Sequence, residues 1–271
     1  MKSKGFAILA PPVELILDIP LGFALGFVIG LTGVGGGAIV APALYVILGM
    51  NYAEAVALSL IYSVFTKIFS VIQHLRQGTV LWKLTLLYGL SGIPGAVVGS
   101  RVLYLAGEDT RGLFPFLMSA VLVIVSLLIL LETKIQALFS RQKPFHPDEI
   151  GWKAGLAIAG FQQVVGMLMG LTSIGSGSLV ILSLVYLFRM SAREIVGSNI
   201  AIALLMVIPA SLTHFAVGGV PWAHLALLLV GSLGGAVLGA KSTLVLPDRV
   251  LKAAIVILIM TGALATVVKA W

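Results

Sequence analysis

The feature that most constrains this chain is an internal duplication. A shift of 140 residues aligns the two halves without a gap, so that residues 26–37 fall on residues 166–177. The same shift aligns further residues across each half, namely Glu54 with Glu194, His74 with His214, Gly78 with Gly218, and Trp82 with Trp222. In a strongly apolar chain, two related halves with one glycine-rich break each are typical of transporters that bind substrate between the repeats.

Composition indicates a protein of the lipid bilayer. Of the 271 residues, 59% are hydrophobic and 10% are charged, and the mean hydropathy is +1.13; a soluble domain has about a quarter charged residues. The chain has no cysteine, which excludes disulfides and thiolate metal sites. The net charge of +7 does not indicate a nucleic-acid partner, because the basic residues lie in short loops between apolar segments, where membrane topology explains them.

Ten apolar segments predict an all-α, polytopic membrane protein. They cover residues 19–31, 38–50, 53–75, 84–105 and 112–131 in the first half, and residues 154–171, 178–190, 192–216, 223–246 and 250–268 in the second. One long polar stretch separates the two sets. We therefore predict a first transmembrane repeat over residues 1–131, a basic linker over residues 132–153 and a second transmembrane repeat over residues 154–271.

Two of these segments are too short to cross a bilayer. A complete span needs roughly 20 residues, because a helix rises about 1.5 Å per residue and the hydrocarbon layer is about 30 Å thick. Segments 38–50 and 178–190 have thirteen residues each, and each follows a glycine-rich break. Irregular backbone at membrane depth must be covered by protein or water. We expect two pairs of broken or re-entrant helices whose tips lie near the middle of the membrane.

The number of segments predicts the topology. Five segments per half is an odd number, so the second repeat is expected to be inverted relative to the first. With both termini outside and the linker in the cytoplasm, most basic residues fall in inner loops, as the positive-inside rule requires. Lys2 and Lys4 are exceptions, because this arrangement leaves them outside.

The two glycine-rich breaks are the candidate binding site. At each break the first amides of the following helix lack an intrahelical acceptor, and the helix dipole adds partial positive charge. Glycine lets a ligand approach the backbone closely, so two facing tips would form an amide-lined cup for a small anion. The candidate residues are Thr32, Gly33, Gly35, Gly36 and Gly37 in the first tip, and Thr172, Ser173, Gly175, Ser176, Gly177 and Ser178 in the second.

Small residues can also serve tight helix packing in membranes. We assign that role to Gly95 with Gly99 and to Gly235 with Gly239. The pairs Asn51–Glu54 and Ser191–Glu194 have the spacing of capping boxes and predict helix starts rather than ion ligands.

Polar residues inside the apolar segments supply further candidates. Lys67 aligns with Val207, so the duplication does not require it. An ammonium inside a membrane usually faces a cavity or a partner, so Lys67 either balances the charge of an anionic substrate or extends toward the interface. Asn199 is a second candidate, with a helix–helix hydrogen bond as the alternative. His74 and His214 are expected to form hydrogen bonds near the membrane interface.

Two other function classes remain open. Gly175-Ser176-Gly177 together with His214 also suggests an intramembrane serine protease. However, Ser176 aligns with Gly36, whereas the histidine is duplicated, which favours an architectural role. A passive anion channel would use the same amide-lined cup.

The glycine motifs also resemble a known family. Residues 30–37, Gly-Leu-Thr-Gly-Val-Gly-Gly-Gly, followed by Pro42, and their weaker copy at residues 170–177 resemble the TauE/SafE sulfite exporter family over residues 20–269. The resemblance implies a transporter of the prokaryotic inner (plasma) membrane, or a plant or protist relative, for small sulfur-containing anions such as sulfite, sulfonates or thiolates. It implies no bound cofactor and no ATPase subunit. Ser173 and Ser176 replace family glycines in the second copy, so its side of the site should be richer in hydroxyls.

Overall fold

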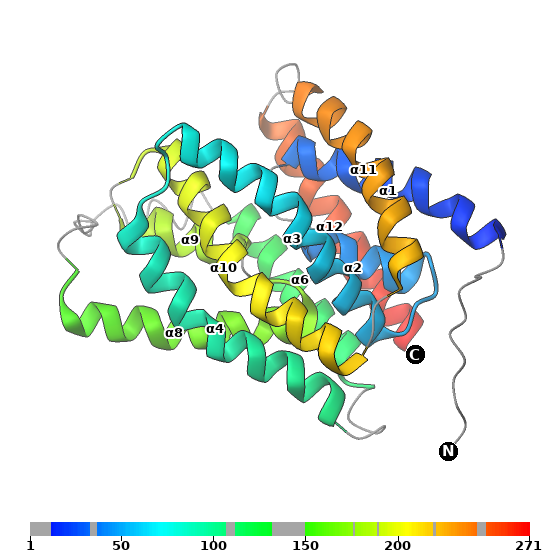
Figure 1. Cartoon of the computed structure of the whole chain (residues 1–271), viewed down its shortest axis with the longest axis horizontal. Helices are drawn as coiled ribbons and strands as arrows, with labels where there is room; N and C mark the ends of the chain where they lie inside the picture. The colour runs from blue at the N-terminus through cyan, green and yellow to red at the C-terminus, as the bar shows by residue number, and fades with distance from the viewer. Residues whose placement is uncertain are drawn as a thin grey trace. The chain divides into compact units, whose positions relative to one another are not determined.

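The chain is helical over most of the part that the structure, a computed structural model, describes (Figure 1). The described residues are 12–32, 37–106, 112–131, 150–175, 177–188, 190–218, 221–242 and 248–271. They form ten helices: α1 (Pro12–Thr32), α2 (Gly37–Val46), α3 (Tyr52–Arg76), α4 (Trp82–Leu105), α6 (Phe114–Leu130), α8 (Trp152–Thr172), α9 (Ser178–Leu187), α10 (Ala192–Gly218), α11 (Trp222–Ser242) and α12 (Asp248–Ala270). The all-α prediction is confirmed.

Helix length and composition agree with a polytopic membrane protein. Among the described residues, α3, α4, α8, α10 and α11 each contain an apolar stretch long enough to cross a membrane. The two short helices are present as predicted, but α2 ends at Val46 and α9 at Leu187, three or four residues before the predicted ends. Gly49 adopts a φ of 67° after α2, a turn conformation that the apolar pattern did not reveal.

The helices group into two compact units, each with members from both halves of the duplication. The first unit comprises Met1–Gly33 and Val220–Ala253 and contains α1 and α11. The second comprises Val34–Gly219 and Ala254–Trp271 and contains α2 to α10 and most of α12.

In the first unit, α1 and α11 cross closely through glycines. A Cβ added to any of these glycines would overlap the backbone of the other helix, as for Gly22 on Leu228, Gly26 on Ser232, Gly231 on Ile19 and Gly235 on Phe23. The residue numbers rise together along both helices, so α1 and α11 run parallel. Backbone contacts of this kind are typical of glycine-mediated packing in membranes.

In the second unit, α4 and α8 cross in the same way. The close contacts are Gly95 with Gln163, Gly99 with Met167, Gly166 with Gly92 and Gly170 with Ala96. The shift of 140 residues relates Gly166–Gly92 to Gly26–Ser232, and Gly95–Gln163 to Gly235–Phe23. Duplicated positions thus make equivalent contacts, and the packing role predicted for Gly95, Gly99 and Gly235 is confirmed.

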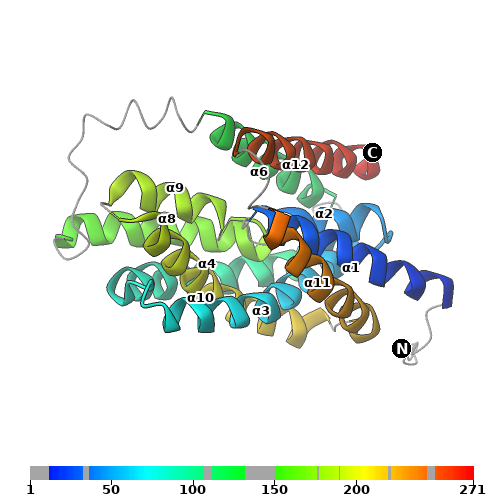
Figure 2. The ribbon, with the colours of Figure 1, turned by 90° about the horizontal axis from the view of Figure 1, so that it is seen from above.

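The second unit also contains the third helix of each half. α3 and α10 lie against each other and run in opposite directions (Figures 1 and 2). α10 instead runs parallel to α4, because Gly89 faces Leu205 and Gly92 faces Met206. α8 is parallel to α4 as well, so α8 and α10 run in the same direction and α9 connects them.

Both predicted capping pairs start a helix. The Glu54 N–H donates to Asn51 Oδ1 at 2.9 Å at the start of α3. At the start of α10, the Glu194 N–H donates to Ser191 Oγ at 3.3 Å, and the Ser191 N–H donates to Glu194 Oε2 at 2.8 Å. The second pair forms both hydrogen bonds of a capping box, whereas the first pair forms the bond from the Glu54 N–H to the N-cap side chain.

Removing the Ser191 cap should destabilise α10 slightly. We expect Ser191→Ala to lower the free energy of unfolding by about 1 kcal/mol, because the Glu194 N–H loses its acceptor. Thermal unfolding in detergent measures the change. Ser183→Ala is a matched control, since the Ser183 hydroxyl donates to the Val180 carbonyl within a helix; an equal loss in both variants would contradict the capping role.

Candidate functional site

The second glycine motif forms a sharp break between α8 and α9. Ser173 ends α8 with a φ of 63°, in the left-handed region that L residues rarely adopt, and Gly175 has a φ of 126°. The Ser173 N–H donates to the Met169 carbonyl at 2.7 Å, and the Ile174 N–H donates to Thr172 Oγ1 at 3.1 Å. We call residues 172–175 the α8 tip.

Side chains from three other helices hold the end of α8. Nε2 of His214, on α10, donates to the Gly170 carbonyl at 3.0 Å, and Nδ1 of the same ring accepts from the Tyr104 hydroxyl of α4 at 3.1 Å. The Tyr52 hydroxyl of α3 donates to the Leu171 carbonyl at 2.9 Å. Two carbonyls that the break leaves without helical partners, those of Gly170 and Leu171, are therefore satisfied. The hydrogen-bonding role expected for His214 is confirmed, but its partners lie inside the protein.

The α8 tip lies within the helix bundle rather than at its end. Gly170 packs against the backbone of Ala96 and Ser100 on α4, and α4 continues to Leu105. At about 1.5 Å per residue, this places Gly170 roughly 10 Å, and the end of α8 roughly 7 Å, inside the end of α4.

α2 begins against the α8 tip. A Cβ added to Gly37 would overlap the Ser173 carbonyl and lie 3.2 Å from Ser173 Oγ. Gly37 is buried, and Ser173 is 4% exposed. The start of one short helix thus meets the break that precedes the other. We call this contact the Gly37–Ser173 junction.

Several predicted site residues lie outside what the structure describes. These are Gly33, Gly35, Gly36 and Ser176, together with the side chains of Thr32 and Ser178. Gly177 is described as the N-cap of α9. The Leu179 N–H already donates to the Gly175 carbonyl at 3.3 Å, so the break itself satisfies part of the first turn of α9.

Ser173 carries a buried hydroxyl that has no hydrogen-bond partner among the described residues. A buried unpaired polar group costs about 1–3 kcal/mol, so such a group is informative beside a helix start. Thr172 differs, because its hydroxyl donates to the Leu168 carbonyl at 2.7 Å and accepts from the Ile174 N–H. Ser173 is therefore the hydroxyl of the tip that is available to a ligand.

Lys67 lies on a polar face of α3. It is 8% exposed, and no ion pair within the described part of the chain involves it. Ser63 and Ser59 precede it at four-residue spacing on the same face. Both serines are buried, and the Ser63 hydroxyl has no partner among the described residues. The sequence analysis missed Ser63, for which the spacing to Lys67 was the available signal.

Asn199 lies near the start of α10, whereas His214, which contacts the end of α8, lies near its end. Its neighbour Ser198 accepts a hydrogen bond from the Leu81 N–H at 2.9 Å, just before α4 begins. Asn199 precedes His214, which contacts the end of α8, by fifteen residues, or about 22 Å along a helix. Asn199 is buried, and the structure does not bring it to the Gly37–Ser173 junction.

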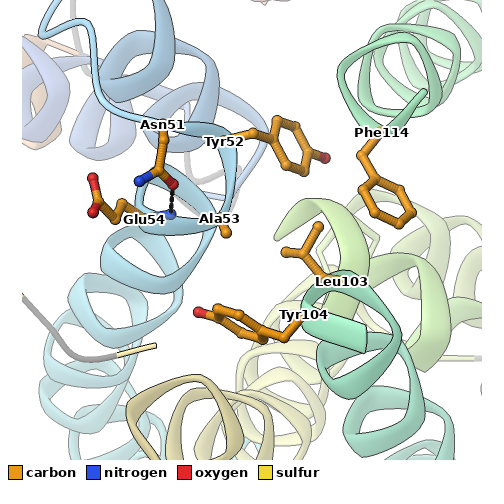
Figure 3. Close-up of a pocket in the computed structure, with 7 residues that line it drawn as sticks. All are labelled: Asn51, Tyr52, Ala53, Glu54, Leu103, Tyr104 and Phe114. Carbon is orange, nitrogen blue, oxygen red and sulfur yellow. Dashed lines mark hydrogen bonds between the residues drawn. The ribbon is translucent and has the colours of Figure 1, made fainter. Parts of the chain in front are cut away.

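A pocket of about 410 Å³ opens beside the end of α8 (Figure 3). Its lining comes from the start of α3, the end of α4 and the start of α6: Asn51, Tyr52, Ala53, Glu54, Leu103, Tyr104 and Phe114. Tyr52 stacks on Phe114 with ring centroids 6.2 Å apart. Two lining residues are hydrogen-bonded to the end of α8 or to the side chain that holds it. The Tyr52 hydroxyl donates to the Leu171 carbonyl, and the Tyr104 hydroxyl donates to His214.

Comparison with known proteins identifies the family. The family model described as "Sulfite exporter TauE/SafE" matches residues 19–266 of the chain. The chain belongs to the TauE/SafE family. The resemblance seen in the glycine motifs is confirmed.

TauE/SafE relatives cover nearly the same length. "Probable membrane transporter protein YjnA" of Bacillus subtilis is 34% identical over 235 residues, covering 84% of this chain and 89% of the relative. YdhB of the same organism is 29% identical and covers 89% of this chain and 95% of its own. A "probable membrane transporter protein" of Xylella fastidiosa is 26% identical over 83% of this chain and 84% of the relative. No solved structure gives a significant match.

As a TauE/SafE member, the chain is a membrane transporter and not an enzyme. The geometry of His214 agrees with this conclusion. Its Nε2 donates to the Gly170 carbonyl and its Nδ1 accepts from Tyr104, so neither ring nitrogen is left to activate a serine. The protease alternative is therefore rejected.

Proposed function

We propose that this TauE/SafE protein is a secondary transporter for small sulfur-containing anions, which bind at the Gly37–Ser173 junction. The observation that carries the proposal is the buried Ser173 hydroxyl, which lacks a partner among the described residues and lies where α2 begins. A helix start offers N–H groups without intrahelical acceptors and partial positive charge, both of which favour an anion. The hydroxyl adds a directed donor.

The polar face of α3 adds a buried cationic side chain to the proposed transport path. Lys67 and Ser63 are buried on one side of this helix, and Ser63 has a hydroxyl without a partner among the described residues. An uncompensated ammonium inside a membrane protein is costly and marks a substrate or ion pathway. Lys67 follows Tyr52, which contacts the end of α8, by fifteen residues, or about 22 Å along a helix. We therefore propose that Lys67 balances the charge of the anion during its passage and not at the junction itself. Asn199 has a structural role in this scheme.

Alternating access requires two related halves that can exchange conformations. What supports this mechanism is the opposite direction of α3 and α10, which are equivalent helices of residues 1–131 and 154–271. The equivalent contacts Gly26–Ser232 and Gly166–Gly92 also support this mechanism, because they show that the two halves pack in the same manner. We propose that the two segments are inverted repeats joined by a cytoplasmic linker, with both termini outside the plasma membrane.

The pocket of Figure 3 provides a route to the junction. In the proposed topology, the starts of α3 and α6 and the end of α4 lie on the outer side, so this pocket opens outward. Its lining residues Tyr52 and Tyr104 bond to the Leu171 carbonyl and to His214 at the end of α8. Movement of these rings would connect the binding site with the outside.

A flux screen tests the proposed function. Purified protein in liposomes is tested with sulfite, sulfoacetate, taurine, thiosulfate and a simple mercapto-acid. A transporter gives saturable uptake and counterflow, whereas an anion channel gives flux that does not saturate and a measurable single-channel conductance. No flux with any of the five compounds would contradict the proposed substrate class.

Replacing the Ser173 hydroxyl should weaken anion binding without unfolding the protein. We expect Ser173→Ala to raise the Kd of the transported anion roughly tenfold, because one hydrogen bond to a charged ligand is lost. Isothermal calorimetry in detergent measures this change. Ser211→Ala is the matched control, since this buried hydroxyl donates to the Ile208 carbonyl within α10. Equal affinity in the two variants would contradict the role of Ser173.

A further inference from the structure

A buried carboxylate and a histidine meet between α1 and α11, in the first unit. His224 Nδ1 lies 2.7 Å from Asp18 Oδ2. The Asp18 side chain is fully buried, whereas 18% of the His224 side chain is exposed. The pair therefore combines a carboxylate enclosed by protein with a partly exposed imidazole.

The duplication shows that this helix crossing does not require a polar pair. The positions equivalent to Asp18 and His224 are Ile158 and Leu84, on α8 and α4, which cross through equivalent glycines. Ile158 is 6% exposed and Leu84 is fully buried, both within the main apolar core of the second unit. One copy of the crossing thus has two aliphatic side chains where the other has two titratable ones.

Such a replacement is unfavourable for packing alone. Ionisable side chains within apolar segments are rare because desolvation penalises the charged form, and those that occur mark ion or proton pathways. An Asp–His pair can bind one proton: with a neutral imidazole and a carboxylate the pair has a charge of −1, and with one further proton it is neutral. Imidazole is also the side chain suited to proton exchange near neutral pH.

We propose that Asp18 and His224 form the proton-binding site that couples anion transport to proton movement. This inference rests on the proposed function as a secondary transporter. The proton enters through His224, the partly exposed member of the pair, and neutralises the pair. The changed charge acts on the glycine-mediated crossing of α1 and α11, where Gly231 packs on the backbone of Ile19, next to Asp18. α1 continues from Asp18 to Thr32, where the first glycine motif begins.

No other titratable side chain competes with the pair within the described surroundings. Over residues 17–29 of α1 and 222–239 of α11, whose side chains are described, Asp18 and His224 are the sole titratable groups. The remaining charged residues of the helices in this unit are Glu14, Lys241, Asp248, Arg249 and Lys252, whose side chains lie outside the described residues.

The experiment measures proton movement directly. Liposomes with the purified protein contain a pH-sensitive dye, and sulfoacetate is added outside. We expect internal acidification in step with sulfoacetate uptake in the wild-type protein, and accumulation of sulfoacetate when the outside is made acidic. In Asp18→Asn, accumulation driven by the pH gradient should fall at least about tenfold, within the usual size of coupling between sites. Sulfoacetate counterflow, which needs no net proton movement, should persist.

A double variant protects the test against a folding defect. Asp18→Ile with His224→Leu reproduces the residues of the equivalent crossing, which packs with Ile158 and Leu84. It should retain counterflow and lose acidification. Retained acidification in this variant or in Asp18→Asn, or wild-type uptake without acidification, would overturn the inference. Absence of saturable uptake in the wild-type protein would instead count against the proposed function.

Discussion

Substitution of Gly37 by alanine is expected to reduce anion binding at least about 100-fold, while the protein still inserts into the membrane. The added Cβ would overlap the Ser173 carbonyl, which is a backbone atom and cannot rotate away. The α8 tip cannot retreat easily either, because His214 holds the Gly170 carbonyl and Tyr52 holds the Leu171 carbonyl. α2 and the tip must therefore move apart, and displacements of about 1 Å in a preorganised site can cost this much.

The matched control is another glycine-to-alanine change in an apolar helix. An added Cβ at Gly160 of α8 meets no atom within 4 Å, so Gly160→Ala should bind the anion like the wild type. Calorimetry with purified protein gives the affinity, and size-exclusion chromatography in detergent reports whether each variant is folded. A monodisperse Gly37→Ala protein with wild-type affinity would show that the ligand does not bind at the Gly37–Ser173 junction.

The helices and their breaks could be predicted because local sequence determines them. Apolar runs separated by glycine-rich motifs gave the short helices α2 and α9, and the Ser191–Glu194 spacing gave the start of α10. The ends of the short helices were less accurate. The apolar pattern continues past Val46, whereas the backbone turns at Gly49, and hydrophobicity does not report such a turn.

The environment of the α8 tip could not be predicted because its partners are distant in sequence. Tyr52 and Leu171 are 119 residues apart, and His214 and Tyr104 are 110 apart. Tyr52 and Tyr104 align with Ala192 and Leu244, so the duplication drew no attention to them. The left-handed conformation of Ser173 has no local signal either, because serine has no strong preference for it.

Departures from the duplication supply most of the buried polar groups to which a function is proposed here, whereas the matched Gly37 supplies a close backbone contact. Matched glycines, such as Gly26 and Gly166, form equivalent helix crossings and are explained by packing. The unmatched residues Asp18, Lys67 and Ser173 are instead buried groups that packing does not need. A duplicated transporter needs one substrate path and one coupling path, so each copy is free to lose polar groups that the other retains. Functional residues are thus expected where the two halves differ.

His74 and His214 are aligned by the duplication but differ in their hydrogen bonds, so substituting them should have different effects on stability. We expect His214→Leu to lower the free energy of unfolding by about 2–4 kcal/mol, because the buried Gly170 carbonyl and the partly buried Tyr104 hydroxyl each lose a partner. His74 aligns with His214 but is partly exposed, and its Nδ1 lies 2.9 Å from Thr79 Oγ1. The Thr79 hydroxyl also donates to the His74 backbone carbonyl at 3.2 Å. This hydrogen bond does not involve the imidazole ring and remains possible when His74 is substituted.

His74→Leu should therefore cost less than about 1 kcal/mol. Thermal and denaturant unfolding of both variants in the same detergent measure the difference. In the proposed site the anion binds next to the end of α8, which His214 holds in place, so a saturating concentration of the transported anion should restore part of the stability lost in His214→Leu. If the two histidine variants were equally stable, the end of α8 would not depend on His214, and the rigid tip assumed for Gly37→Ala would lose its support.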